Sequence, residues 1–407
     1  MINRIKTYLG SISADAWAVC VYFLCLPFTV VTTPVGSLLK VMTMPVVAVL
    51  AYKLLIGKRK PLAFNSVQLV YSLYMVYVIF GMFWFRSETA MVHTKDMLLA
   101  YFVMILMSMR VYNEKERDII ETSWILVGII CTALCLTSTQ VANEFENRTI
   151  VYVLGFPEDP NQFCAYFIMP VMVCMKRIVE KRKTTPLYML LAILIVYSVL
   201  RTGSRGGFIG IMMGVFVCIM IAVKSFKAKA LITLAVIFCA VIVATVVFPM
   251  LPEDVQARYS VDSVVADSGA GRFDIWKYLV QYTIDSPVRL IRGSGLLSTY
   301  EILDGANVPV SAGAAHNQFV QVLCDQGILG MLLFVALIMV CFFRNVRKNP
   351  YYACAFVAVM AFSMSLTLYV FKPYINIIIM CAMNFAKTPC AKGAEDENDK
   401  RTLEKEL

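Results

Sequence analysis

Twelve apolar stretches follow one another along the chain, and short polar connections separate most of them. A helix needs about 20 apolar residues to cross a bilayer, so this pattern predicts an all-α, polytopic membrane protein with about 12 transmembrane helices. The last stretch is short for a complete crossing. The predicted spans are residues 15–33, 35–56, 62–85, 95–112, 118–139, 161–176, 187–202, 206–223, 229–250, 316–343, 351–371 and 373–386.

One long polar interval, residues 251–315, interrupts the apolar pattern. It separates nine predicted spans in residues 1–250 from three in residues 316–386. The tail, residues 387–407, has mixed charges and few apolar residues, a composition that predicts disorder. Because the rest of the chain is expected to be membrane helix or short connection, we expect the interval 251–315 to be the working part of the protein.

Composition agrees with a membrane protein and excludes an ordinary soluble domain. Hydrophobic residues make up 59% of the chain and charged residues 16%, with a mean hydropathy of +0.72. Soluble domains are nearer half apolar and a quarter charged. The net charge of +10 comes from short Lys and Arg clusters between spans, not from one basic face. We therefore expect no nucleic-acid partner.

The Lys and Arg clusters also predict the orientation of the chain. With twelve spans, 25 of the 37 Lys and Arg residues fall at the two termini and in the connections on the same side. Cytoplasmic loops carry such an excess of positive charge. Both termini are therefore expected in the cytoplasm, and the interval 251–315 is expected to face the outside of the cell.

Cysteine and acidic residues give no sign of a metal or cofactor site. Most of the 13 cysteines lie inside apolar stretches, none lies between residues 251 and 315, and no CxxC pair occurs. We interpret them as small buried residues and expect neither a metal nor a cofactor. The nearest outer acidic pair is Glu158 and Asp159, and Asp159-Pro160 is typical of a helix start.

The first candidate for chemistry is the turn Arg201-Thr202-Gly203-Ser204-Arg205-Gly206-Gly207 between the seventh and eighth spans. Its glycines allow a ligand to approach the backbone, and its arginines are planar forks suited to phosphate. The alternative is a helix hairpin whose arginines cap carbonyl groups or extend to the membrane interface. Two arginines on the outer side oppose the usual charge bias, which favours a functional role.

The second candidate is Gly271-Arg272, which begins an expected helix in the long interval. Phe273, Trp276, Val280 and Ile284 follow at helical spacing. They predict an amphipathic helix on the membrane surface with Arg272 in its first turn. Asp285-Ser286-Pro287 ends this helix and Gly293-Ser294-Gly295 forms a second turn. The alternative for Arg272 is a solvated loop charge.

The third candidate is Ala315-His316-Asn317, at the beginning of the tenth span. Histidine has an unperturbed pKa near neutrality and can take a proton from a hydroxyl group. A structural cap is the alternative. Gln318, Gln321 and Asp325 continue along the same face as a polar stripe, which indicates a cavity lining or bonds to a neighbouring helix.

Taken together, these motifs resemble the bacterial O-antigen ligase and polymerase superfamily. The resemblance rests on Pro160-Asn161, Ser204-Arg205-Gly206, Gly-Arg-x-x-x-Trp in the long interval, Ala315-His316-Asn317, and Asp-Gln-Gly-Ile-Leu-Gly from Asp325. It covers roughly residues 161–344. It implies a twelve-helix enzyme of the GT-C type in the bacterial inner membrane. Such an enzyme transfers sugar chains from an undecaprenyl diphosphate donor on the outer leaflet without a metal.

By this resemblance Arg205 and Arg272 match the arginines that bind the donor diphosphate, and His316 matches the catalytic histidine. Supporting positions are expected from Arg201, Ser204, Asn317, Gln318 and Gln321. The chemistry agrees, because diphosphate is a stable anionic leaving group that needs arginines more than a strong acid. A base is still needed for the attacking hydroxyl.

The expected activity is polymerisation of a cell-surface polysaccharide, with ligation to a lipid or protein acceptor as the alternative. Both use an undecaprenyl diphosphate-linked oligosaccharide, a glycan or other hydroxyl acceptor, and membrane lipid, and either could involve other polysaccharide export proteins. A more distant alternative is a non-enzymatic flippase or transporter for lipid-linked sugars. That class would require more charged residues inside the spans than Lys40 and Asp325.

Overall fold

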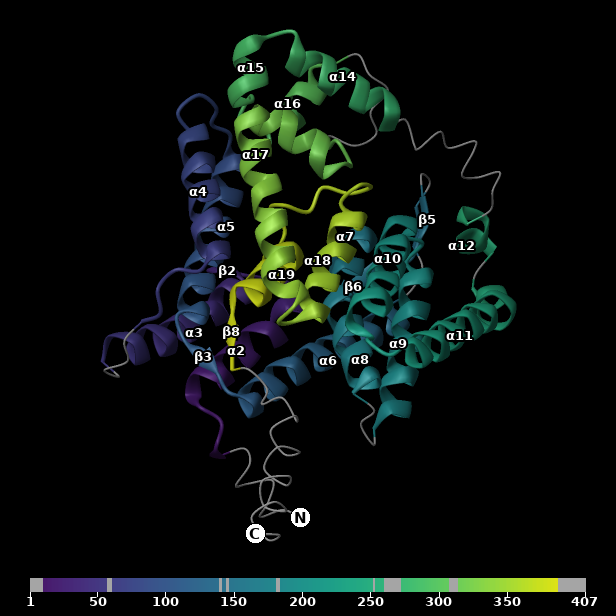
Figure 1. The fold of residues 1–407 in the computed structure, drawn as a ribbon. Helices are drawn as coiled ribbons and strands as arrows, with labels where there is room; N and C mark the ends of the chain where they lie inside the picture. Colours follow the sequence, from purple (N-terminus) through teal and green to yellow (C-terminus); the bar gives the residue numbers. More distant parts are fainter. Residues whose placement is uncertain are drawn as a thin grey trace.

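Apolar helices form most of the computed structural model of the protein (Figure 1). It describes residues 10–56, 61–138, 141–143, 146–180, 184–251, 253–259, 272–306 and 314–386. Among these residues, seven helices are long and apolar enough to cross a membrane. They are α3 (Leu38–Leu55), α5 (Glu88–Ser108), α6 (Glu114–Thr137), α7 with α8 (Pro160–Ala165, Ile168–Val179), α10 (Arg205–Ala222), α11 with its continuation (Phe226–Met250) and α17 (Gln318–Val346).

Shorter apolar helices complete the bundle. They are α2 (Ala14–Leu24), α4 (Ser66–Gly81), α9 (Thr185–Arg201), α18 (Pro350–Phe362) and α19 (Lys372–Ala382). With the seven long ones they correspond one to one with the twelve predicted spans. The all-α membrane fold is therefore confirmed in its general class, while a complete crossing by each of the shorter helices stays a prediction.

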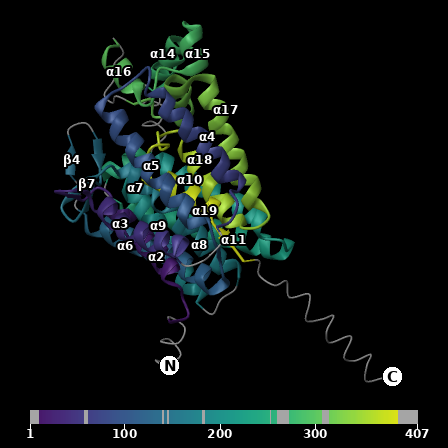
Figure 2. The same ribbon diagram turned by 90° about the vertical axis from the view of Figure 1, so that its left-hand side faces the viewer.

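The described part of the long interval contains four short helices. They are α12 (Glu253–Arg258), α14 (Arg272–Ile284), α15 (Pro287–Arg292) and α16 (Ser298–Asp304). The last three lie above the first residues of α17 (Figure 1, top), and α15 and α17 stay side by side in the turned view (Figure 2). The predicted helix from Arg272 to Ile284 is confirmed, as is the break at Asp285-Ser286-Pro287.

Strands are few and short in the described part of the chain. Four two-stranded sheets pair β1 (Thr32–Thr33) with β2 (Gly36–Ser37), β3 (Val111–Tyr112) with β8 (Asn384–Phe385), β4 (Val141–Asn143) with β5 (Glu146–Arg148), and β6 (Val151–Val153) with β7 (Phe156–Glu158). Only β3 and β8 run parallel, and they join the end of α5 to the end of α19. The predicted tail, residues 387–407, lies outside the described residues.

One predicted span is wrong in its extent. The stretch 351–371 is apolar enough to read as one helix, but α18 ends at Phe362 and residues 363–371 form a buried irregular connection to α19. Ser363, Ser365 and Thr367 alternate with apolar residues there. Met364 N and Ser365 N still donate to the carbonyl oxygens of Ala361 and Phe362 in single turns, and the helix does not continue beyond them.

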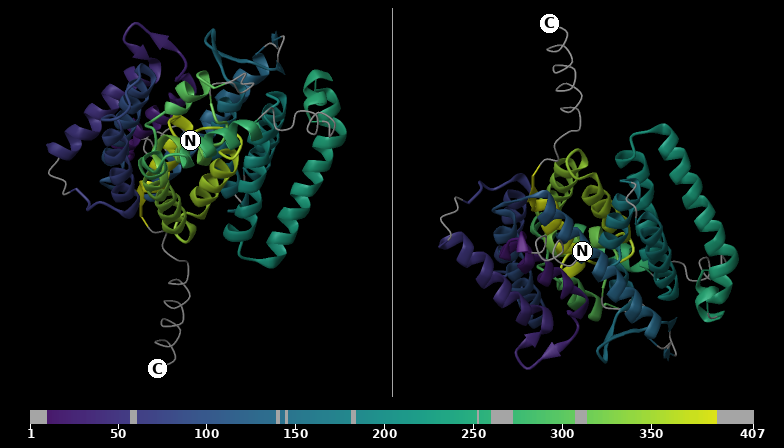
Figure 3. Two further views of the ribbon diagram at one scale, coloured as in Figure 1. Left: turned by 90° about the horizontal axis from the view of Figure 1, so that it is seen from above. Right: turned by 90° about the horizontal axis from the view of Figure 1, so that it is seen from below.

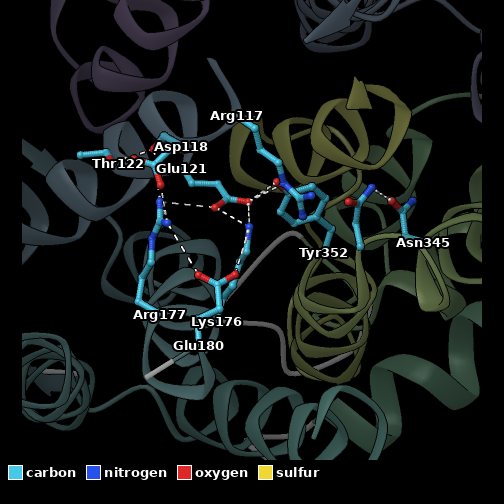
Figure 4. A network of polar contacts seen from close by, with 10 residues as sticks. Arg117, Asp118, Glu121, Thr122, Lys176, Arg177, Glu180, Asn345 and Tyr352 are labelled. Atoms are coloured by element: carbon cyan, nitrogen blue, oxygen red, sulfur yellow. Dashed lines mark hydrogen bonds and ion pairs between the residues drawn. The ribbon is translucent and has the colours of Figure 1, made fainter. Parts of the chain in front are cut away.

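A buried charge network joins α6, α8 and α18 (Figure 4). The Glu121 carboxylate of α6 accepts from Lys176 Nζ of α8 at 2.6 and 2.7 Å and from the Tyr352 hydroxyl of α18 at 2.6 Å. Arg117 Nε donates to Glu121 at 3.1 Å. Three acidic and three basic side chains meet here, so their charges balance and α6, α8 and α18 are held together: Arg117, Asp118, Glu121, Lys176, Arg177 and Glu180.

Candidate functional site

The two arginines of the turn between α9 and α10 have different surroundings. Arg201 donates from its guanidinium to the carbonyl oxygens of Leu136 at 3.1 Å and Ser138 at 3.0 Å, at the end of α6. It therefore caps a helix, as the alternative interpretation of this turn predicted. Arg205 is the first residue of α10 and is half-buried. Ser204 is the N-cap of α10, and its hydroxyl accepts from Gly207 N at 3.2 Å.

Arg272 is the first residue of α14 and points toward the connection between α18 and α19. Its Nη1 donates to the Ser365 carbonyl oxygen at 3.2 Å. One turn later, Trp276 Nε1 donates to the Ala315 carbonyl oxygen at 2.7 Å. The helix therefore holds its arginine and its tryptophan against two segments that are remote in sequence.

His316 precedes α17 in a conformation that L-residues rarely adopt. Its φ is +48°, in the left-handed region. Asn317 is the N-cap of α17 and accepts from Phe319 N at 2.9 Å and Val320 N at 3.2 Å. The N-cap of α17 is therefore Asn317, the residue after the histidine. Strained backbone of this kind gathers at functional sites.

Ser365 contacts both the first candidate, the turn between α9 and α10, and the second candidate, Arg272. Gly206, which follows Arg205, packs so closely that a Cβ atom there would overlap the Ser365 hydroxyl. Ser365 also accepts from Arg272 through its carbonyl oxygen. Ser365 therefore lies against Gly206, the neighbour of Arg205, and accepts from Arg272. Ala315, the neighbour of His316, accepts from Trp276 of the same helix as Arg272.

The polar stripe of α17 holds that segment in place. The backbone N of Gln318 donates to the Ser363 carbonyl at 2.9 Å, and its side-chain Oε1 accepts from Leu368 N at 3.0 Å. Gln321 Oε1 accepts from the Thr367 hydroxyl at 2.7 Å. The stripe therefore bonds a neighbouring segment, in the direction of the second predicted alternative, although that segment is irregular and not a helix.

Asp325 connects the outer helices to the same assembly. Its buried carboxylate accepts from the Tyr369 hydroxyl at 2.8 Å, from Leu297 N at 3.0 Å and from Thr299 N at 3.0 Å. The hydroxyls of Ser298 and Thr299 donate to it at 3.1 and 2.7 Å. Close by, Gly327 has φ +64° and bends α17, so that Gly293 can approach its backbone.

The sequence prediction missed residues 363–371, which every part of the candidate site contacts. Their polar members were hidden in a predicted span because the hydropathy of the whole window is high. The signal that could have found them is the period-two alternation of Ser363, Ser365 and Thr367, which is incompatible with one helix face.

Acidic groups near the site are few. Glu158 lies at the end of β7, where burial and the neighbouring Asp159 raise the pKa of its carboxyl to about 7. Asp159 is the N-cap of α7 and accepts from Gln162 N at 2.9 Å, as its place before Pro160 predicts. Among the described residues, no three His, Cys, Asp or Glu side chains gather as a metal would require.

Comparison with known families supports the resemblance drawn from the motifs. Residues 190–335 match the O-antigen ligase family. The matched range contains Arg205, Arg272, His316 and Asp325, so the resemblance to the O-antigen ligase and polymerase superfamily is confirmed there. The match includes α10, α14–α16 and most of α17, the elements that gather at the candidate site, and it stops before residues 363–371.

The chain is also similar to a solved structure but to no curated protein. A chain from the solved structure described as "Structural coordination of polymerization and crosslinking by a peptidoglycan synthase complex" is similar with a TM-score of 0.42 and 13% sequence identity, over 79% of this chain and 95% of that one.

The region that matches the O-antigen ligase family also borders a large apolar cavity. Helix α11 lies apart from its neighbours at the edge of the molecule (Figure 3), and a cavity of about 1270 Å³ separates it from α8–α10. Phe208 lines the cavity one helical turn after Arg205, and Lys224 lines it near the other end of α10. Its walls are otherwise mostly apolar side chains, among them Ile193, Val196, Ile211, Met212, Val215 and Leu231.

Proposed function

We propose that the protein is a glycosyltransferase of the inner membrane. It transfers a sugar chain from undecaprenyl diphosphate to a hydroxyl acceptor at the outer face. In this proposal Arg205 and Arg272 bind the donor diphosphate and His316 takes the proton from the attacking hydroxyl. The observation that supports it is that the Arg272 guanidinium and Gly206, the neighbour of Arg205, both contact Ser365, and that Trp276 bonds Ala315 beside His316, within the region that matches the O-antigen ligase family.

The proposed chemistry follows from charge. The bond between the anomeric carbon and the diphosphate breaks as the acceptor oxygen attacks, and negative charge grows on the departing diphosphate. Two planar guanidinium groups stabilise that charge most when they are already positioned before the reaction. The hydrogen bond from Arg272 to the Ser365 carbonyl supports such preorganisation.

The apolar cavity supports a lipid-linked donor. A diphosphate bound at Arg205 would have its carrier directly above Phe208, where the cavity begins. A polyprenyl chain contains only carbon and hydrogen and fits walls made of Ile, Val, Met and Leu.

We favour polymerisation of a surface polysaccharide over ligation to a lipid or protein acceptor. In polymerisation both substrates are lipid-linked glycans, so the enzyme would bind two anionic carriers, whereas ligation to a protein would need only the donor site.

The direct test is transfer in vitro. Purified full-length protein in lipid nanodiscs, supplied with an undecaprenyl diphosphate-linked oligosaccharide, should lengthen the glycan and release undecaprenyl diphosphate in equal amounts, with and without EDTA. Release of undecaprenyl diphosphate with no longer glycan would argue against transfer to a sugar. No turnover of any lipid-linked donor, by protein that binds it, would overturn the proposal.

A further inference from the structure

A second cluster of charges lies where α3, α5 and α19 meet. One of its members, Lys372, directly follows residues 363–371. Lys40 Nζ of α3 contacts Asp96 Oδ1 of α5 at 2.7 Å, and Lys372 Nζ of α19 contacts Asp96 Oδ2 at 3.2 Å. Two ammonium groups therefore share one carboxylate. Unlike the balanced network around Glu121, this cluster keeps one excess positive charge within the described part of the chain.

Burial makes that excess charge unusual. The side chain of Lys372 is 9% exposed and that of Asp96 16%, and all three residues belong to apolar helices. An ammonium group removed from water is costly unless anions surround it. One carboxylate between two lysines satisfies only half of this requirement, so the cluster is suited to a further anion.

The cluster is open on one side and connected to the candidate site on the other. The Lys40 side chain is 33% exposed, so a ligand can reach it from the surface of α3. His93 lies in the same place, with its ring edge-on to Phe371 at a centroid distance of 5.9 Å. Lys372 follows Ser365 by seven residues, a distance of at most about 25 Å along an extended chain.

We propose that Lys40 and Lys372, with His93 beside them, bind the phosphate groups of the lipid that carries the acceptor glycan. This inference rests on the proposed function, in which Arg205 and Arg272 bind the donor diphosphate. A transfer between two lipid-linked glycans needs two such anion sites on either side of the reacting atoms. Asp96 positions both lysines and competes with the phosphate for them.

The test compares acceptors and variants in the full-length protein in nanodiscs without anionic lipid. The acceptor is offered either on undecaprenyl diphosphate or as the same glycan without lipid or phosphate. Loss of one lysine contact to phosphate should raise KM for the lipid-linked acceptor roughly tenfold in Lys40→Gln and Lys372→Gln. It should leave KM for the free glycan and for the donor unchanged. Lys95→Gln, an exposed neighbour of Asp96, is the control.

Asp96→Asn separates binding from a structural role. If the cluster binds phosphate, removal of the competing carboxylate should lower KM for the lipid-linked acceptor. If the lysines serve only to neutralise Asp96, then Asp96→Asn should impair the enzyme as much as Lys372→Gln, and the triple variant Lys40→Gln/Asp96→Asn/Lys372→Gln should recover. That second pattern would overturn the inference.

Two further outcomes distinguish failure of the acceptor site from failure of the proposed function. Equal KM for the lipid-linked acceptor in wild type and both lysine variants, with transfer intact, would overturn the acceptor site and leave the proposed function standing. A KM effect that disappears when phosphatidylglycerol is added to the nanodiscs would show a site for bulk anionic lipid, which also overturns an acceptor site.

Discussion

Arg201 and Arg205 are four residues apart in one turn, but the structure gives them different surroundings. Arg201 caps the end of α6 through two carbonyl oxygens. Arg205 begins α10 beside Gly206 and Ser365. Residue type and local sequence do not distinguish them, whereas the tertiary neighbours do. We therefore expect Arg201 to affect stability and Arg205 to affect transfer.

Replacing either proposed diphosphate ligand by lysine should be nearly as harmful as replacing it by alanine. Lysine keeps the charge but cannot form two parallel hydrogen bonds to phosphate oxygens. We expect Arg205→Lys and Arg272→Lys to lower kcat/KM by about 10- to 100-fold. Lys277→Ala, on the exposed face of α14, is the matched control. A similar loss in the control would show that these effects report general charge.

His316 can be tested without disturbing its unusual backbone. Asparagine tolerates the left-handed conformation better than most residues, so His316→Asn removes the base and keeps the φ of +48° accessible. Loss of general-base assistance should slow transfer by roughly 10²- to 10⁴-fold. Thermal stability and donor binding, measured in parallel, should change little.

The pH profile provides the control for this assignment. Rates of the wild type should fall at acid pH because a protonated imidazole cannot accept a proton. Glu158, whose carboxyl pKa is raised to about 7, titrates in the same range. Glu158→Gln should therefore keep the acid limb, and His316→Asn should lose it in its residual rate. The reverse result would assign the limb to Glu158 and leave His316 with a structural role.

At the scale of elements, the Asp325 carboxylate of α17 is the attachment point of the beginning of α16. Asp325 accepts from the beginning of α16 and from Tyr369, so it positions both α16 and residues 363–371. Helix α14, which carries Arg272, packs on the same helix α17. The geometry of the site therefore depends on a residue that touches none of its proposed catalytic groups.

Asp325→Asn should loosen this attachment. An amide presents one acceptor oxygen in place of two, so several of the donors lose their partner, at about 1–3 kcal/mol for each buried group left unsatisfied. We expect a lower melting temperature and faster proteolysis within residues 272–306. Asp304→Asn, exposed on α16, is the control. Unchanged proteolysis in Asp325→Asn would show that other contacts hold α16.

Two adjacent methionines of α10 lie on different sides of the helix relative to the cavity beside α11, so their substitution should affect donor binding differently. Met212 lines it, while Met213 points outward and is 43% exposed. Met212→Trp should fill part of the space proposed for the polyprenyl chain and raise KM for the donor several-fold. Met213→Trp adds the same side chain outside the cavity and should behave like the wild type. Equal donor kinetics in both variants would exclude the cavity as the lipid site.

The whole molecule places its proposed site and its balanced charge network at opposite ends of the helices. The α9–α10 turn adjoins the end of α6, whereas Glu121 lies near the beginning of α6. This separation agrees with the charge bias that predicts an outer face for the site and a cytoplasmic face for the network.

Cysteine labelling can test that orientation in intact cells. Asp285→Cys, exposed between α14 and α15, should react with a membrane-impermeant maleimide, and Lys348→Cys, exposed between α17 and α18, should react only after permeabilisation. Native thiols should contribute little, since the cysteines with described side chains are buried except for half-buried Cys25. Labelling with the opposite sidedness would contradict an active site at the outer leaflet.

What the sequence by itself determined is the set of elements and the positions of the unusual side chains. Twelve apolar stretches became twelve apolar helices because hydrophobicity and helix length are local properties of the chain. The start of α14 at Arg272 and that of α7 at Pro160 also followed from local spacing and capping residues.

What only the tertiary structure decided is which of these side chains meet. The irregular segment 363–371, the capping role of Arg201 and the cluster around Asp96 depend on contacts between residues 50 to 276 positions apart. Local propensity contains no information about such contacts. They form because buried polar groups need partners, and the partners are found by packing helices together, not along the chain.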